Sequence, residues 1–400
     1  MWIKRDFIQY FNHEEGLEAL LIRGPRQIGK SSLILKLEPS VVDQLYLDDP
    51  AIRNSANADS EFVIQNLRLP ALIDEVQLAP PLFFSIKKHI DYLRRERLLK
   101  NTNHEMNLYR LTGSDQTLLD EQVRETLAGR IQSYFLYGLS VNELVNFDKN
   151  IQIKEILFRG GFPELWIRKE LNPVRFINNY ISTFVEKDIA RSAGIEKIKS
   201  FMNALQLMAA RTGELLNYES LGADAGVAGK TIKDWVSILE QNKILYILKP
   251  YHSNLNKRLI KMSKVYFCDI GICTRLQSHQ EVDTILHSPQ AGHLFENLVM
   301  SEILKTEANF FKNWNIFFWR TKEKEEIDFI IEDYEKIMLI EVKLKSSSQY
   351  KIKIPKTIEE TKKEIILVVV SSVGETIQNA ENNFIVPIKN LAMFLNKYLK

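Results

Sequence analysis

The chain has 400 residues, of which 45% are hydrophobic and 26% are charged, and its formal net charge is +2. These proportions are typical of a folded protein with two or three domains and exclude an intrinsically disordered chain. Two cysteines are too few for a disulfide framework, the N-terminus lacks a signal-peptide core and no apolar run is long enough to span a membrane, so we expect a cytoplasmic protein without membrane contact.

A phosphate-binding motif lies near the N-terminus. Residues Gly24–Ser31 read GPRQIGKS and match G-x-x-x-x-G-K-[ST]. The apolar run Ala19–Ile22 predicts a buried strand before the motif, and Ser31–Leu37 predicts a helix after it. We expect Lys30 to bind the β- and γ-phosphates of ATP and Ser31 to bind Mg²⁺. The expected ATP site comprises Gly24, Pro25, Arg26, Gln27, Ile28, Gly29, Lys30, Ser31 and Ser32.

Polar residues that such a site uses follow later in the same domain. Asp74 and Glu75 end an apolar run, where we expect Asp74 to hold Mg²⁺ through water and Glu75 to polarise the attacking water. Ser114, with Thr112 as second choice, ends another strand and could reach the γ-phosphate; ordinary turn hydroxyls are the alternative. Arg130 could neutralise phosphate charge in its own subunit or in a neighbouring one, or only form a surface salt bridge.

Two short helices with a glycine turn between them are predicted in the middle of the chain. Tyr218–Ala225 and Gly229–Glu240 have the spacing of a helix-turn-helix. Ile244–Leu248 and Val265–Phe267 predict the strands of a wing. Together these elements favour a winged-helix module.

This module has features that suit DNA. Its second helix would present Lys230, Thr231 and Lys233 from its first turns. The stretch that follows has no acidic residue and six basic ones suited to phosphate contacts: Lys243, Lys249, Lys257, Arg258, Lys261 and Lys264. A winged helix that only docks proteins is the alternative.

Acidic residues and a lysine gather near the C-terminus. The strands predicted at Glu326–Ile331 and Met338–Lys343 would form a hairpin that sets Asp328 beside Glu341, with Lys343 on the face of Glu341. Together with Glu296 from a preceding helix, these carboxylates suit Mg²⁺ or Mn²⁺, and Lys343 would orient or deprotonate a water molecule for phosphodiester cleavage. A solvated hairpin face, and a nuclease-like fold used only for binding or assembly, are the alternatives.

Several motifs in order carry a family resemblance. GPRQIGKS, LIDEVQ, LTGS and ETLAGR, followed by RGGFPE and YISTFVEKD, resemble the AAA-type ATPases of bacteria and archaea that have a C-terminal domain of unassigned function; Ser31 and Ser32 replace the usual threonine. The resemblance implies ATP hydrolysis, a winged helix and a homo-oligomer. Asp328 and Glu341-Val342-Lys343, with Glu296 as the helix acid, are similar to the motif of PD-(D/E)XK nucleases.

We therefore predict an α/β protein with an AAA-type P-loop parallel-sheet domain (1–145), a helical region (146–200), a winged helix (201–285) and a restriction-endonuclease-like α/β domain (286–400). The predicted function is ATP hydrolysis coupled to metal-dependent cleavage of DNA. The second hypothesis is an ATP-switched nucleic-acid-binding or scaffold protein whose C-terminal domain is catalytically silent. A third, an ATP-driven remodeller of a protein partner not identified by the sequence, applies only if DNA does not bind.

Overall fold

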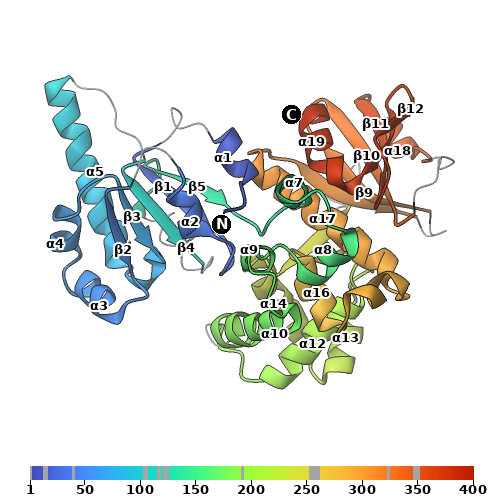
Figure 1. The fold of residues 1–400 in the computed structure, drawn as a ribbon, viewed down its shortest axis with the longest axis horizontal. Coiled ribbons are helices and arrows are strands. Elements are labelled where there is room, and N and C mark those ends of the chain that lie inside the picture. Colours follow the sequence, from blue (N-terminus) through green and yellow to red (C-terminus); the bar gives the residue numbers. More distant parts are fainter. Residues whose placement is uncertain are drawn as a thin grey trace. The chain divides into compact units, whose positions relative to one another are not determined.

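The structure is a computed structural model that describes residues 2–11, 17–37, 41–101, 107–114, 119, 126–190, 193–251, 262–321, 325–345 and 352–400. The chain forms two compact units, which Figure 1 shows. The N-terminal unit is Arg5–Tyr137, and the C-terminal unit is Gly138–Lys400 with the first four residues. The predicted domains 146–200, 201–285 and 286–400 thus all lie within the C-terminal unit, and the division falls before the predicted boundary at 145.

The N-terminal unit is built on a parallel sheet in the strand order β2-β3-β4-β1-β5. This parallel sheet confirms the predicted α/β class of the domain. Strands β1 and β4 are almost wholly buried, as expected for central strands of a sheet covered on both faces. The strands are β1 (Ala19–Arg23), β2 (Asp43–Tyr46), β3 (Ala71–Asp74), β4 (Tyr109–Gly113) and β5 (Ile131–Phe135).

Helices surround this sheet and bury apolar side chains against it. Phe83 and Ile86 of the longest helix, α5, pack in one core with Ile73 and Leu111 of the strands. The helices of this unit are α1 (Asp6–Tyr10), α2 (Lys30–Ile34), α3 (Pro50–Ala58), α4 (Ser60–Gln65), the 3-10 turn η2 (Val76–Leu78) and α5 (Pro81–Lys100).

The C-terminal unit begins with a helical region, followed by the elements predicted for a winged helix. The helical region comprises α7 (Val141–Phe147), α8 (Ile153–Arg159), α9 (Pro163–Ile167), α10 (Pro173–Tyr180) and the π-helix η3 (Ile181–Ile189). The next elements are α12 (Ile198–Ala210), α13 (Tyr218–Ala225), α14 (Gly229–Gln241), β6 (Leu245–Pro250) and β7 (Lys264–Phe267). Gly226 ends α13 in the left-handed conformation, and β6 pairs with β7 in antiparallel fashion.

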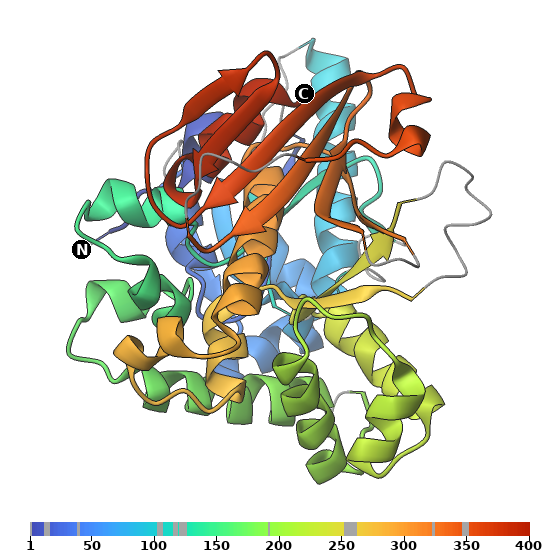
Figure 2. The same cartoon turned by 90° about the vertical axis from the view of Figure 1, so that its right-hand side faces the viewer.

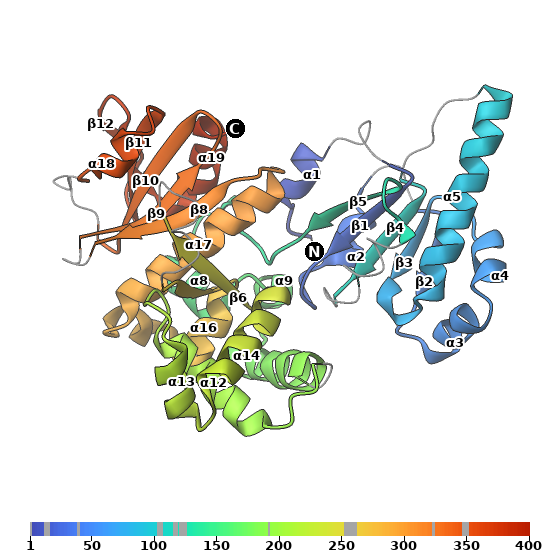
Figure 3. The ribbon, with the colours of Figure 1, turned by 180° about the vertical axis from the view of Figure 1, so that it is seen from behind.

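The wing strands belong to the same sheet as the last part of the chain. Strand β6 pairs in parallel with β8, so the sheet runs in the order β12-β13-β11-β10-β9-β8-β6-β7, and Figure 3 shows β6 beside β8. The sheet therefore has no break at the predicted boundary near residue 285. The other strands are β8 (Asn315–Arg320), β9 (Glu326–Glu332), β10 (Lys336–Lys343), β11 (Glu364–Ser371), β12 (Ile377–Ala380) and β13 (Asn383–Pro387).

Helices α17 (Ala291–Asn309) and α19 (Ile388–Tyr398) contact each other and the strands of this sheet. Figure 2 shows α17 as the long orange helix beside the strands. The remaining helices are α16 (Ile270–Leu276), the 3-10 helix η4 (Val282–His287) and α18 (Lys356–Glu359).

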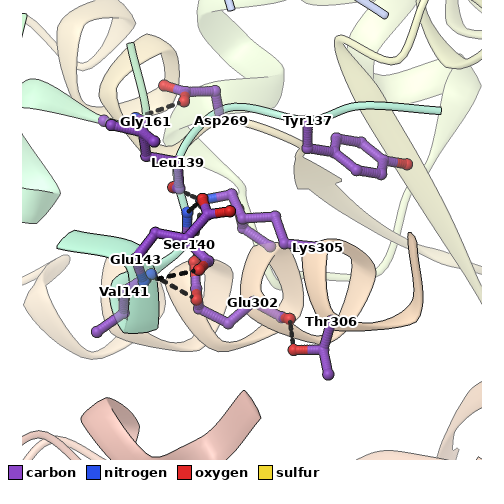
Figure 4. Close-up of polar contacts among 12 residues, drawn as sticks. Tyr137, Leu139, Ser140, Val141, Glu143, Gly161, Asp269, Glu302, Lys305 and Thr306 are labelled. Atoms are coloured by element: carbon purple, nitrogen blue, oxygen red, sulfur yellow. Dashed lines mark hydrogen bonds and ion pairs between the residues drawn. The ribbon is translucent and has the colours of Figure 1, made fainter. Parts of the chain in front are cut away.

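A buried polar network holds the first residues of the C-terminal unit (Figure 4). On α17 the Lys305 ammonium lies 2.9 Å from the Leu139 carbonyl oxygen and 2.9 Å from the Glu302 carboxylate, which accepts from the Val141 N–H at 2.7 Å. Both charged side chains are at most 2% exposed. Because each charge is paired and hydrogen-bonded, burial is tolerated and residues 139–141 are fixed onto α17.

Candidate ATP site and carboxylate cluster

The expected phosphate-binding loop follows β1 at the carboxyl edge of the parallel sheet. Gly24, Gln27 and Gly29 have positive φ values of 154°, 62° and 88°. A Cβ atom on Gly24 would lie 2.2 Å from the carbonyl oxygen of Leu136, so only glycine fits there. The buried Arg5 guanidinium donates a hydrogen bond to the Ile28 carbonyl at 3.0 Å and so holds the backbone of the loop in place.

Lys30 is the first residue of α2, and its side chain is only 5% exposed. Its ammonium lies 3.0 Å from the Pro25 carbonyl oxygen and 3.6 Å from the Glu75 carboxylate. Burial lowers the pKa of Lys30, and the attraction of Glu75 and Asp74 only partly offsets this effect. Because the nearby carboxylates do not fully compensate for the burial of this ammonium, an anionic phosphate would be a favourable partner for it.

Asp74 ends β3 next to the loop. One of its carboxylate oxygens accepts from the Ser31 hydroxyl at 2.5 Å and from the Thr112 hydroxyl at 2.5 Å. Hydroxyl and carboxylate oxygens are the ligands that Mg²⁺ prefers, and here they converge from α2 and β3. The residues present therefore fit the expected ATP-bound magnesium ion.

Glu75 follows β3 with a left-handed backbone, φ 55°. One oxygen of its carboxylate accepts from the Ser114 N–H at 3.1 Å, the Ser114 hydroxyl at 2.7 Å and the Gln77 amide at 2.6 Å. Burial would raise the pKa of Glu75, but Lys30 and the hydrogen bonds from Gln77 and Ser114 outweigh burial and lower it. Glu75 is thus an ionised carboxylate at neutral pH, and the Ser114 hydroxyl contacts both Glu75 and, at 3.5 Å, the Gln77 amide.

Gln77 was missed by the sequence analysis. It lies on η2 and is 5% exposed. The available signal was its place at the end of the LIDEVQ motif, two residues after Glu75. Because Gly113 has no side chain, the Gln77 amide can approach it; a Cβ there would lie 2.7 Å from the Gln77 Oε1 atom.

Arg130 lies at the opposite edge of the sheet from the phosphate-binding loop. Its carbonyl oxygen accepts from the Ala19 N–H at 3.0 Å, so Arg130 stands beside the beginning of β1, whereas the loop follows its end. Its guanidinium pairs with both oxygens of Asp91, at 2.6 and 3.0 Å. Since the five residues of β1 span about 16 Å, action on phosphate within the same subunit does not fit. The salt bridge is present, and a role in a neighbouring subunit stays a prediction.

The predicted C-terminal residues come together where α17, β9 and β10 meet. Register pairing sets Phe329 opposite Ile340, which brings Asp328 beside Glu341. Asp328 accepts from the Val342 N–H at 2.7 Å, and the Lys343 ammonium lies 2.9 Å from Glu341. Burial, with the nearby charges of Glu296 and Glu341, raises the pKa of Asp328 to about 8.

Two side chains of β7 lie within this group of acidic residues. We define the carboxylate cluster as Glu296, Glu326, Asp328 and Glu341. Lys264, at the start of β7, lies 3.0 Å from Glu296 and 2.5 Å from Glu326, which begins β9. The Tyr266 hydroxyl donates to Glu296 at 2.5 Å. The sequence analysis missed these roles of Lys264, Tyr266 and Glu326, for which a lysine and a tyrosine alternating along a strand were the available signal.

Lys264 is therefore a correction to the predicted basic surface. Its side chain is 3% exposed and its ammonium lies 5.5 Å from the centre of the Phe318 ring, so it cannot contact nucleic acid. Lys249 is exposed and Lys243 is half-buried. Lys257, Arg258 and Lys261 lie outside the described residues.

The cluster does not fit a divalent ion as it stands. In the described part of the chain, no group of three or more His, Cys, Asp and Glu side chains is arranged to hold a metal ion. One Glu296 oxygen accepts from both Lys264 and Tyr266. The predicted metal ligands Glu296, Asp328 and Glu341 are thus neighbours, and their binding of a metal ion stays a prediction.

The helix predicted to contact DNA presents its basic residues to solvent. Lys230 and Lys233 of α14 are exposed and Thr231 is half-buried. The opposite face of α14 buries Ile232, Trp235, Val236 and Leu239. The helix is amphipathic in the orientation that the prediction requires.

Across the ranges described, none of the helices combines the length and apolarity needed to cross a membrane.

Three family models match successive parts of the chain. Residues 17–145 match an AAA domain, residues 150–283 a domain of unknown function, DUF8612, and residues 291–391 another, DUF4143. These three segments cover the ATP site, the helical and winged-helix elements and the part of the chain that carries Glu296, Asp328 and Glu341.

The chain is also similar to proteins described as uncharacterized. One from Methanocaldococcus jannaschii is 24% identical over 98% of this chain and 88% of the relative. One from Mycobacterium tuberculosis is 24% identical over 78% and 67%, and one from Haemophilus influenzae is 22% identical over 80% and 81%.

Solved structures with likeness to the chain include two from Aeropyrum pernix. The ORC2 protein in ADPNP–ADP complexes has a TM-score of 0.31 and 14% identity, covering 72% of this chain and 90% of that one. The ORC1 protein in complex with DNA has a TM-score of 0.27 and 12% identity, covering 67% and 88%. Scores of this size carry no argument about fold or function.

Proposed function

Because residues 17–145 match an AAA-type ATPase domain, we propose that the protein is an ATP-hydrolysing switch that binds nucleic acid and whose C-terminal domain does not cut it. The observation that carries the hydrolysis is the assembly of Lys30, Asp74 and Glu75 at one edge of the parallel sheet. The Glu75 carboxylate lies 3.6 Å from the Lys30 ammonium, within the same buried site.

Each residue of this site has a role that its geometry supports. ATP with Mg²⁺ supplies the phosphoryl group to be transferred and its counterion when bound. Lys30 binds the phosphates, while Ser31 and Asp74 hold the metal ion. Glu75, kept ionised, orients the attacking water and accepts its proton, and Ser114 with Gln77 positions Glu75.

Nucleic-acid binding is assigned to α14, because Lys230 and Lys233 are exposed on its outer face. Lysine contacts to phosphate release counterions, so the affinity should fall with salt. In fluorescence anisotropy with duplex DNA, the Lys230→Ala/Lys233→Ala double variant should bind about tenfold more weakly, with a salt slope smaller by about 2. The matched control, Lys353→Ala/Lys389→Ala, removes one exposed and one half-buried lysine from the C-terminal domain. Equal binding by both double variants and the native protein would refute this assignment.

Metal-dependent DNA cleavage is the second candidate, because Asp328, Glu341 and Lys343 lie on adjacent strands as a nuclease requires. The test incubates the protein with ATP and Mg²⁺ or Mn²⁺ on linear, supercoiled and single-stranded DNA. Cleavage that disappears in Asp328→Ala would establish the nuclease. ATP turnover without cleavage in either metal supports the switch.

We also propose a homo-oligomer, in which Arg130, out of reach of the ATP site of its own subunit, leaves its salt bridge with Asp91 to serve the site of a neighbour. Mass measurement with and without ATP tests this. Arg130→Ala should slow ATP turnover only under conditions where the oligomer forms. If DNA does not bind at all, an ATP-driven remodeller of a protein partner takes the place of the nucleic-acid switch.

A further inference from the structure

The Lys264 ammonium lies inside the carboxylate cluster and is almost wholly removed from solvent. It is 3.0 Å from Glu296 and 2.5 Å from Glu326, and its side chain is 3% exposed. The Phe318 ring lies 5.5 Å away on one side. A lysine buried this deeply is retained only if anions compensate for its lost hydration.

The compensation is extensive. Two carboxylates form ion pairs with the ammonium, Glu296 and Glu326, and the charge of Asp328 also acts on it. The positive charge of Lys264 in turn attracts each of the carboxylates around it, so the cluster already contains a counterion.

A second donor shares one Glu296 oxygen with Lys264. The oxygen that accepts from Lys264 accepts from the Tyr266 hydroxyl as well. The other oxygen lies 3.9 Å from His293 Nδ1. A divalent ion bound to Glu296 would lie close to the Lys264 ammonium, and the repulsion between the two cations opposes its binding.

We propose that Lys264 is the resident cation of the carboxylate cluster, taking the place of a divalent metal ion and excluding it. Lys264 begins β7, which pairs with β6 of the wing, so the same contact ties the wing strands to the cluster. The inference accounts for the silent C-terminal domain of the proposed function but depends on neither ATP hydrolysis nor DNA binding.

The test is a Mn²⁺ titration of the full-length protein without nucleotide or DNA, followed by electron paramagnetic resonance of the free ion. The native protein and Asp328→Asn should bind the same amount of Mn²⁺, because the native cluster holds none. Lys264→Met, which keeps the length of the side chain but not its charge, should gain one site at least about tenfold tighter than any in the native protein. The double variant Lys264→Met/Asp328→Asn should lose that site.

Lys363→Met is the matched control. Lys363 pairs with Glu332 at 3.0 Å and is half-buried in the same domain but outside the cluster. Its replacement should create no Mn²⁺ site. A new site in Lys363→Met, or none in folded Lys264→Met, would overturn the proposal.

The native protein tests the proposal even if Lys264→Met does not fold. A Mn²⁺ ion bound to the native chain and released by Asp328→Asn would show that Lys264 does not exclude the metal. This outcome differs from failure of the proposed function, which would appear as missing ATP turnover or missing DNA binding while the Mn²⁺ titration stays unchanged.

Discussion

The two candidate sites each contain a buried lysine that faces carboxylates, yet the pKa values of the two lysines are shifted in opposite directions. Lys30, 5% exposed, has one carboxylate at 3.6 Å, and its pKa is lowered because burial dominates. Lys264, 3% exposed, has carboxylates at 2.5 and 3.0 Å, and its pKa is raised because they outweigh burial.

This difference separates a binding site from a structural one. A buried cation with too few anions becomes more stable when an anionic ligand arrives, which is the role we propose for ATP at Lys30. A buried cation with its anions already present has nothing to gain from a ligand, and its removal would leave those carboxylates buried without a cation. The comparison predicts that loss of Lys30 affects function and loss of Lys264 affects stability.

The largest effect is expected at Lys264. Lys264→Met leaves Glu296 and Glu326 without their cation, so the free energy of unfolding should fall by about 3–5 kcal/mol. Urea unfolding of the native protein, Lys264→Met and Lys363→Met measures this. Lys363→Met should lose about 1 kcal/mol or less, because its ion pair is half-exposed. Equal losses in the two variants would break the comparison.

Loss of Lys30 should act on function alone. In Lys30→Ala the catalytic efficiency of ATP hydrolysis should fall about 100-fold or more, because the charge that binds the phosphates is missing. The urea midpoint should stay within error of the native value. Lys36→Ala, which removes an exposed lysine just after α2, serves as the control and should hydrolyse ATP normally. A stable Lys30→Ala that still turns over ATP at the native rate contradicts the site.

A smaller effect is expected at Ser114, which positions Glu75. Ser114→Ala removes the 2.7 Å hydrogen bond to the carboxylate, so kcat should fall about tenfold while KM for ATP stays unchanged. Ser114→Thr, which keeps the hydroxyl, should recover most of the rate. Ser133→Ala, at an exposed position on β5, is the control. A rise in KM without loss of kcat would mean that Ser114 contacts the nucleotide instead.

The smallest effect concerns pH and Asp328. Its pKa is about 8 in the folded chain against an ordinary value of 3.8, so the folded state holds the proton more tightly than the unfolded state. The protonated carboxyl therefore contributes its full stabilisation when the pH is below the ordinary pKa of 3.8, and this stabilisation is lost as the pH rises through about 8. An asparagine side chain does not titrate. The melting temperature of Asp328→Asn minus that of the native protein should therefore increase by a few degrees as the pH is raised from about 5 to about 9. A constant difference across that range would contradict the raised pKa.

Local patterns were enough to predict most elements around both sites. The loop follows from a motif, and β1 and β3 follow from apolar runs, because a strand buried on both faces is mostly apolar. Strand β4 was predicted as well, although it buries Arg110 and Thr112. Strands β2 and β5 were not predicted, since their sequences DQLY and IQSYF alternate or mix polar residues. Strand pairing alone makes them part of the sheet.

The sequence by itself determined which residues have the chemistry: a lysine and serine in a glycine loop, acidic pairs after strands, and Asp328, Glu341 and Lys343 at hairpin spacing. Only the tertiary structure decided which of them meet. Lys264 was predicted on a basic surface, but β6 pairs with β8 as well as β7, which carries Lys264 into the carboxylate cluster. Contacts between residues far apart in the chain depend on strand order, and a single sequence does not encode strand order in any local pattern.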